Sequence, residues 1–134
     1  MYERVGGEGF FVDLVNRFYD GVEHEPLLRP LYPADLARPR RHLAMFLAQY
    51  WGGPPRYNEQ RGHPRLRMRH APFAIGPAER DAWLRLMRAS VDASRAAEPD
   101  KEALRSYFAT AAASLINRFP EPGTLGASPL SVLE

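Results

Sequence analysis

The sequence has no cysteine, and it contains a single lysine, Lys101. The absence of cysteine excludes disulfide bridges, thiolate metal sites and cysteine nucleophiles. No apolar run is long enough to span a membrane, and the N-terminus has no signal-peptide pattern, so we expect a cytoplasmic protein with no membrane span. No segment alternates apolar and polar residues with a period of two over a useful length. The sequence therefore predicts no strands.

The excess of positive over negative charge is also small. The 134 residues include 18 Lys and Arg against 16 Asp and Glu, which leaves a formal net charge of +2. Proteins that bind nucleic acid concentrate far more positive charge on one face, so we expect no nucleic-acid partner. A chain of this length holds one hydrophobic core, and therefore one domain.

Helical periodicity dominates the chain. Apolar residues recur at steps of three and four from Gly9 to about His24, and the same pattern predicts a second helix over about 38–51. A third helix is expected from Pro77 to about Ala96, and a fourth from about Lys101 to Asn117. The sequence thus predicts an all-α domain of four main helices, with two short irregular ones.

Glycine and proline mark the connections between these helices. Gly6-Gly7 predicts a flexible entry turn, prolines break the chain over 26–33, and an irregular loop is expected over 56–62. After Phe119 the chain is rich in Pro, Gly, Ser and Thr. We therefore expect a domain over 1–119 and a flexible C-terminal tail over 120–134.

Common catalytic and binding motifs are missing. The four histidines do not pair with one another, or with a carboxylate, at the spacing of a zinc or di-iron site. The helical serines have no Gly-x-Ser-x-Gly turn around them, and the glycine pairs match no nucleotide-binding motif.

One histidine stands in a distinctive segment, 61–73. Pro64 favours the start of a short helix and Pro72 disfavours a helical conformation at Ala71, so the helix is expected to end at or near His70. There it could bind the iron of a haem, or its ring could bond a free backbone carbonyl, and spacing alone favours the second interpretation. The neighbouring arginines could hold haem propionates, contact phosphates or form a solvated face. Of these three roles, the small net charge argues against phosphates.

Several ordered motifs resemble one family, the group II truncated haemoglobins, from Tyr2 to about Phe119. The motifs are Val5-Gly6-Gly7, Arg17-Phe18-Tyr19, Leu31-Tyr32-Pro33, the run from Phe46 to Pro54, the run from Tyr57 to His70, and Glu79 to Leu84. The tryptophan on the third long helix distinguishes group II from group I, and the Gly-Gly motifs argue against group III.

This resemblance implies a shortened globin fold, a two-over-two helical sandwich enclosing haem b. His70 matches the proximal iron ligand, while Tyr19, Tyr32 and Trp83 match the distal polar residues around a bound gas. Pro39 matches the position that gates the distal pocket, which indicates that no distal histidine is present, and His42 lies on the flank. The other candidates are an apolar haem wall (Leu43, Phe46, Met68, Phe73, Met87 and Leu115) and residues near the propionates (Tyr57, Arg67 and Arg69).

The resemblance implies binding of O2, NO and other diatomic ligands. Two or three distal hydrogen-bond donors would hold O2 too tightly for a good carrier, which favours oxygen-dependent redox chemistry such as NO dioxygenation or peroxide detoxification. Such chemistry needs an electron donor, here an unidentified reductase, and a homo-oligomer is compatible with the sequence. Two alternatives remain: a carrier or gas sensor that delivers O2 to a partner, and a haem-free helical interaction module.

Overall fold

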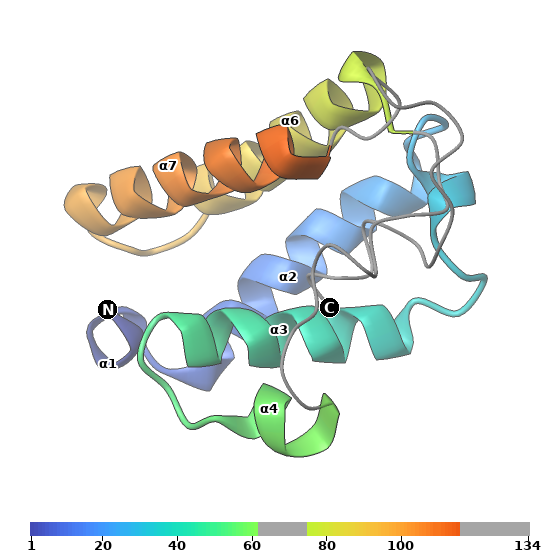
Figure 1. The fold of residues 1–134 in the computed structure, drawn as a ribbon. Helices are drawn as coiled ribbons and strands as arrows, with labels where there is room; N and C mark the ends of the chain where they lie inside the picture. The colour runs from blue at the N-terminus through green and yellow to red at the C-terminus, as the bar shows by residue number, and fades with distance from the viewer. Residues whose placement is uncertain (62–74, 116–134) are drawn as a thin grey trace.

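A computed structural model describes residues 1–61 and 75–115, and over these residues the chain is helical with no strand. Figure 1 shows the arrangement. The elements, in chain order, are α1 (Tyr2–Val5), α2 (Glu8–Glu23), the 3₁₀ turn η1 (Arg29–Leu31), α3 (Ala37–Tyr50), α4 (Arg56–Arg61), α6 (Pro77–Asp92) and α7 (Glu98–Leu115). None of the described helices is both long and apolar enough to cross a membrane.

Two pairs of helices form the core. In Figure 1 the antiparallel pair α6 and α7 lies across the pair α2 and α3, and α2 packs against both α3 and α6. This is the two-over-two helical sandwich that the sequence comparison implied, and the all-α prediction is confirmed for the described residues.

Helix α2 forms the centre of the sandwich because its apolar residues recur every three or four positions. Its buried residues are Phe11, Leu14, Val15, Phe18, Tyr19 and Val22. Gly21 lets α6 approach closely, since a Cβ at this position would lie 2.8 Å from Cδ2 of Leu86. The periodic pattern thus places Tyr19 in the core between two other helices.

The N-terminal turn α1 is tied to two distant parts of the chain. The backbone N–H of Tyr2 donates to the carbonyl of Trp51 at 3.0 Å. The Arg4 guanidinium donates two hydrogen bonds to the Asp100 carboxylate, at 2.6 and 3.0 Å. The hydrogen bonds from Arg4 lower the pKa of the Asp100 carboxyl. Gly53 lies against this turn so closely that a Cβ would stand 2.5 Å from a ring carbon of Tyr2.

Gly6 and Gly7 join α1 to α2. Both have positive φ, 115° and 73°, a backbone conformation that glycine adopts without a steric penalty. The predicted entry turn is therefore present at these two positions, and it follows a short helix that the sequence pattern did not predict.

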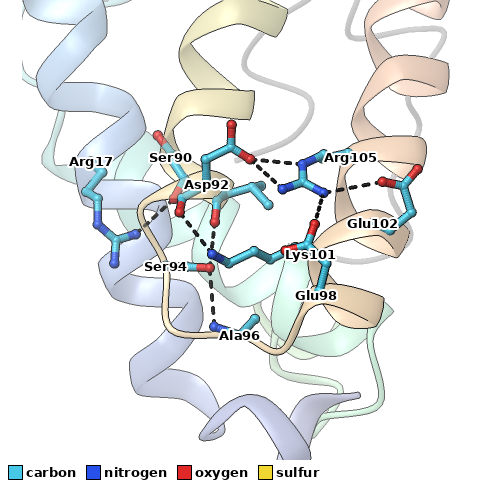
Figure 2. Close-up of polar contacts among 10 residues, drawn as sticks. Arg17, Ser90, Asp92, Ser94, Ala96, Glu98, Lys101, Glu102 and Arg105 are labelled. Carbon is cyan, nitrogen blue, oxygen red and sulfur yellow. Dashed lines mark hydrogen bonds and ion pairs between the residues drawn. The ribbon is translucent and has the colours of Figure 1, made fainter.

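A polar cluster fixes the connection between α6 and α7, as Figure 2 shows. Arg105 on α7 binds the carboxylates of Asp92, Glu98 and Glu102 at 2.7 to 3.3 Å, and Lys101 donates to the carbonyl of Asp92 at 3.0 Å. These contacts join the end of one helix to the first turns of the next. They hold the two helices as an antiparallel pair.

The ends of α6 and α7 differ from the predicted ones. Helix α6 stops at Asp92 rather than near Ala96, because the Ser94 hydroxyl donates to the Val91 carbonyl at 2.6 Å and competes with the next helical turn. Helix α7 begins at Glu98 rather than Lys101. Pro99 lies in its first turn, where a missing N–H breaks no helical hydrogen bond.

The prediction of an irregular loop over 56–62 was wrong for most of this segment, because the helix α4 occupies Arg56–Arg61. The Gln49 side chain accepts a hydrogen bond from the backbone N–H of Asn58 at 3.0 Å, which satisfies a donor at the start of this helix. Tyr57 is fully buried and anchors the helix. The predicted short helix over 64–70 and the tail over 120–134 lie outside the described residues.

Candidate functional site

The three polar residues predicted to surround a bound gas lie together in the core. Tyr19 comes from α2, Trp83 from α6, and Tyr32 directly follows η1. Tyr19 and Tyr32 meet edge to face with ring centroids 5.4 Å apart, and the Phe18 ring lies 5.1 Å from Tyr19 and 5.6 Å from Trp83. One apolar ring thus joins the tryptophan to the tyrosine pair.

These three side chains are almost fully removed from solvent. The exposed fractions are 0% for Tyr19, 7% for Tyr32 and 1% for Trp83, and both phenol oxygens are buried. A buried hydroxyl or indole N–H is costly unless it meets a hydrogen-bond acceptor. The site therefore consists of three polar side chains buried inside an otherwise apolar region.

Tyr32 lies on a loop, and a single arginine organises that loop. The Arg29 guanidinium donates to the carbonyls of Tyr32, Pro33 and Ala34 at 3.4, 3.0 and 2.8 Å. Pro30 occupies the first turn of η1, where its fixed φ suits a helical start. Arg29 thus holds the loop through three backbone carbonyls, and the loop places the Tyr32 ring against Tyr19 on α2.

Arg40 on α3 lies over Tyr19. Its guanidinium carbon is 5.7 Å from the centre of the Tyr19 ring. The same guanidinium donates to Asn16 at 3.2 Å and pairs with Asp20 and Glu23 on α2, at 3.0 and 3.2 Å. Arg40 therefore fixes α3 against the helix that carries Tyr19.

The predicted apolar wall is brought together in part. Leu43 and Phe46 are buried on α3, and Met87 is buried on α6 one turn beyond Trp83. Tyr57, which was assigned to the propionate region, is fully buried and meets Phe46 with ring centroids 5.2 Å apart. These side chains belong to the same hydrophobic core cluster as the three polar residues.

The predicted iron ligand and several predicted neighbours of the haem fall outside the described part of the chain. His70, Met68, Arg67, Arg69 and Phe73 all lie outside the described residues, as does the side chain of Leu115. Within the described ranges, 1–61 and 75–115, no group of three or more metal-ligating residues comes together.

Pro39, predicted to gate the distal pocket, and His42, predicted to lie on its flank, are both buried. Pro39 lies in the first turn of α3, and His42 follows one turn later with 6% of its surface exposed. His42 immediately precedes Leu43, so the two side chains leave the helix in different directions.

Three residues of the site were missed at the sequence level: Phe18, Arg29 and Arg40. Phe18 belongs to the periodic core pattern of α2, and that pattern does not reveal its bridging contact with Trp83. Arg29 binds carbonyls of the loop that follows it, and Arg40 binds residues of the neighbouring helix α2. The local sequence specifies neither set of partners. No signal in the sequence distinguishes them from the other arginines.

Comparison with known proteins gives a consistent result. A family model described as bacterial-like globin matches residues 1–117. The group 2 truncated hemoglobin YjbI of Bacillus subtilis is 47% identical over 91 residues, which is 68% of this chain and 68% of that protein.

Solved structures agree with this match. The hemoglobin of the thermophilic phototrophic bacterium Chloroflexus aurantiacus is 52% identical, with a TM-score of 0.85 over 87% of this chain and 97% of that one. A structure described as truncated oxygen-avid haemoglobin from Bacillus subtilis is 40% identical, with a TM-score of 0.80 over 87% of this chain and 98% of that one.

Proposed function

Because this chain belongs to the bacterial-like globins and is a group II truncated haemoglobin, a family that binds oxygen through haem, we propose that it holds haem b with His70 as the iron ligand. The observation that supports this most directly is the series of ring contacts in the apolar core, in which Phe18 touches both Trp83 and Tyr19, and Tyr19 touches Tyr32. The apolar ring of a haem suits the surroundings of Leu43, Phe46 and Met87, and Arg67 and Arg69 are the proposed partners of its propionates.

Haem supplies a ferrous iron that binds O2, NO and other diatomic gases and shifts negative charge onto the ligand. The phenol O–H groups of Tyr19 and Tyr32 and the indole N–H of Trp83 are hydrogen-bond donors. Their proposed role is to donate to the charged ligand and so to slow its release. Arg40 holds the Tyr19 ring, and Arg29 holds the loop that carries Tyr32.

Slow release favours chemistry over transport. A hydrogen bond to a charged acceptor contributes about 1.5–3 kcal/mol, and two or three of them would retain O2 for long times. We therefore place the protein's use in oxygen-dependent redox chemistry, such as NO detoxification, with electrons supplied by a reductase in the cytoplasm. The similarity to the truncated oxygen-avid haemoglobin from Bacillus subtilis supports slow release of O2.

A visible absorption spectrum tests the haem site. The purified protein should show an intense Soret band, and His70→Ala should weaken the band or change the iron ligation. His24→Ala is the matched control, because His24 is exposed at the end of α2 and should leave the spectrum unchanged. A protein that shows no Soret band after reconstitution with haem contradicts the proposal.

Kinetics separate the enzyme from the carrier. Slow O2 dissociation together with rapid NO consumption, sustained by a reductant, is the result expected of the enzyme. Fast O2 dissociation without NO turnover would assign the chain to transport or sensing instead.

A further inference from the structure

A groove of about 560 Å³ lies beside the first half of α2, where the turn before this helix and the connection from α6 to α7 also reach the surface. Its charged lining residues are Asp13 and Arg17 on α2 and Arg95 in the connection, and Val5 and Phe10 supply apolar side chains. This volume lies within the range of small-molecule sites. None of the described residues that line the groove belongs to the proposed haem site.

The two arginines of this groove pair with no carboxylate elsewhere in the described part of the chain. The partly buried Arg17 donates one hydrogen bond, to the carbonyl of Ser90 at 3.2 Å, and Figure 2 shows its side chain reaching from α2 to α6. Arg95 is exposed. A guanidinium carries five N–H donors in a planar fork that matches a phosphate group, so both arginines keep donors for an anion.

The other lining residues limit which anions fit the groove. The Asp13 carboxylate repels a second anionic group, but it accepts hydrogen bonds from hydroxyl or amino groups. Val5 and Phe10 are partly exposed and form an apolar wall that suits an uncharged ring. Space is open at the glycine that also lines the groove, because a Cβ at Gly9 would meet no atom within 4 Å. The groove therefore suits a ligand with one phosphate group, hydroxyl groups and a flat apolar part.

We propose that this groove binds a nucleoside monophosphate. Arg17 and Arg95 bind the phosphate, the Asp13 carboxylate accepts hydrogen bonds from the ribose hydroxyls, and the base packs on Phe10. Acidic side chains bind ribose hydroxyls in other nucleotide sites, and an aromatic side chain can stack on any base. The site relies on side chains rather than on a glycine-rich phosphate loop, which agrees with the absence of a nucleotide-binding motif from the sequence.

Isothermal titration calorimetry of the full chain with AMP measures this binding. We expect one AMP per chain, and we expect adenosine and inorganic phosphate each to bind at least about tenfold more weakly, because each lacks part of the contacts. Phosphate that binds as tightly as AMP would show that the groove recognises any small anion. Adenosine that binds as tightly as AMP would show that the arginines have no role. Either result, or no binding of AMP, would overturn the proposal.

A pair of arginine variants locates the phosphate. Arg95→Gln removes one charged donor from an exposed side chain and should weaken AMP binding by about tenfold or more. Arg38→Gln is the matched control, because Arg38 is an exposed arginine on α3 that does not line the groove. It removes the same charge and should change AMP binding by less than about twofold, since salt screens distant charges. Equal losses in the two variants would overturn the proposal.

A third variant separates recognition of the base from recognition of the phosphate. Phe10→Leu keeps an apolar side chain in the groove and removes the ring. It should weaken the binding of AMP and leave the binding of inorganic phosphate at the wild-type level, a split that a general loss of structure would not produce. AMP binding that is unchanged in Phe10→Leu would overturn the placement of the base and with it the proposal.

These outcomes are distinct from a failure of the proposed function, on which the groove does not depend. A protein that binds AMP and shows no Soret band would lose the haem site and retain the nucleotide site. A protein with a normal Soret band and no binding of AMP would retain the haem site and lose only the nucleotide site.

Discussion

Replacing Tyr19 by phenylalanine should remove one hydrogen-bond donor from the ligand site and leave its packing intact. The ring is fully buried, and it meets Phe18 at 5.1 Å, Tyr32 at 5.4 Å and the Arg40 guanidinium at 5.7 Å. A phenylalanine ring occupies the same volume and can make each of these contacts. The substitution therefore tests the hydroxyl alone.

The size of the effect follows from the charge on the acceptor. A hydrogen bond to a charged group contributes about 1.5–3 kcal/mol. Since each 1.4 kcal/mol corresponds to a factor of ten, the affinity for O2 should fall by about 10- to 140-fold. Most of that change should appear as faster dissociation, because association of a small gas does not depend on a hydrogen bond that forms after it binds.

Stopped-flow displacement of O2 by CO from the ferrous protein measures the dissociation rate. Tyr2→Phe is the matched control, because Tyr2 belongs to the N-terminal turn α1 and its ring stacks on Phe11 rather than on Tyr19, Tyr32 or Trp83. If Tyr19→Phe shows a normal Soret band and the wild-type dissociation rate, Tyr19 is not a ligand donor and the reasoning is wrong.

Three further predictions concern other parts of the molecule. Trp83→Phe should also speed O2 release, by about tenfold or more if its N–H reaches the ligand, and an unchanged rate in the same stopped-flow assay would remove it from the site. Gly53→Ala should lower the free energy of unfolding by about 1–3 kcal/mol in urea titrations, because the new Cβ would overpack against the N-terminal turn, whereas Gly9→Ala meets nothing within 4 Å and should not destabilise. Because the pKa of Asp100 is lowered in the folded state, this carboxylate stabilises the fold at pH values above its ordinary pKa of 3.8, and the stabilisation is lost as the pH falls through the lower pKa of the folded state. Arg4→Gln should therefore flatten the acid side of a profile of stability against pH. A profile that superimposes on that of the wild type would contradict this.

The long helices could be predicted because their periodicity is local. The steps of three and four along α2 fix both the element and its buried face, and the structure has α2 at Glu8–Glu23. Helix α4 could not be predicted in this way, because its segment has one apolar residue, Tyr57, and its first turn is stabilised by the Gln49 side chain from α3. The early end of α6 likewise depends on a single hydroxyl, that of Ser94.

The candidate site was less accessible to sequence reasoning than the helices were. Nothing local relates Tyr19, Tyr32 and Trp83, which lie 13 and 51 residues apart along the chain. Only the resemblance to a family brought them together as a set, and the ring contacts through Phe18 confirm that they are neighbours in space. Their proposed roles toward a ligand remain predictions.

The loop that carries Tyr32 can change among related proteins more easily than the helices that carry Tyr19 and Trp83. Tyr19 and Trp83 are tied to helical registers, so moving either one shifts a whole buried face. Tyr32 is presented instead by three successive carbonyls gathered on Arg29. A change of loop length or of this single arginine can therefore move the Tyr32 ring, a proposed ligand donor, while the helical frame stays fixed. Among relatives, variation in gas affinity should thus concentrate in this loop before it reaches the helices.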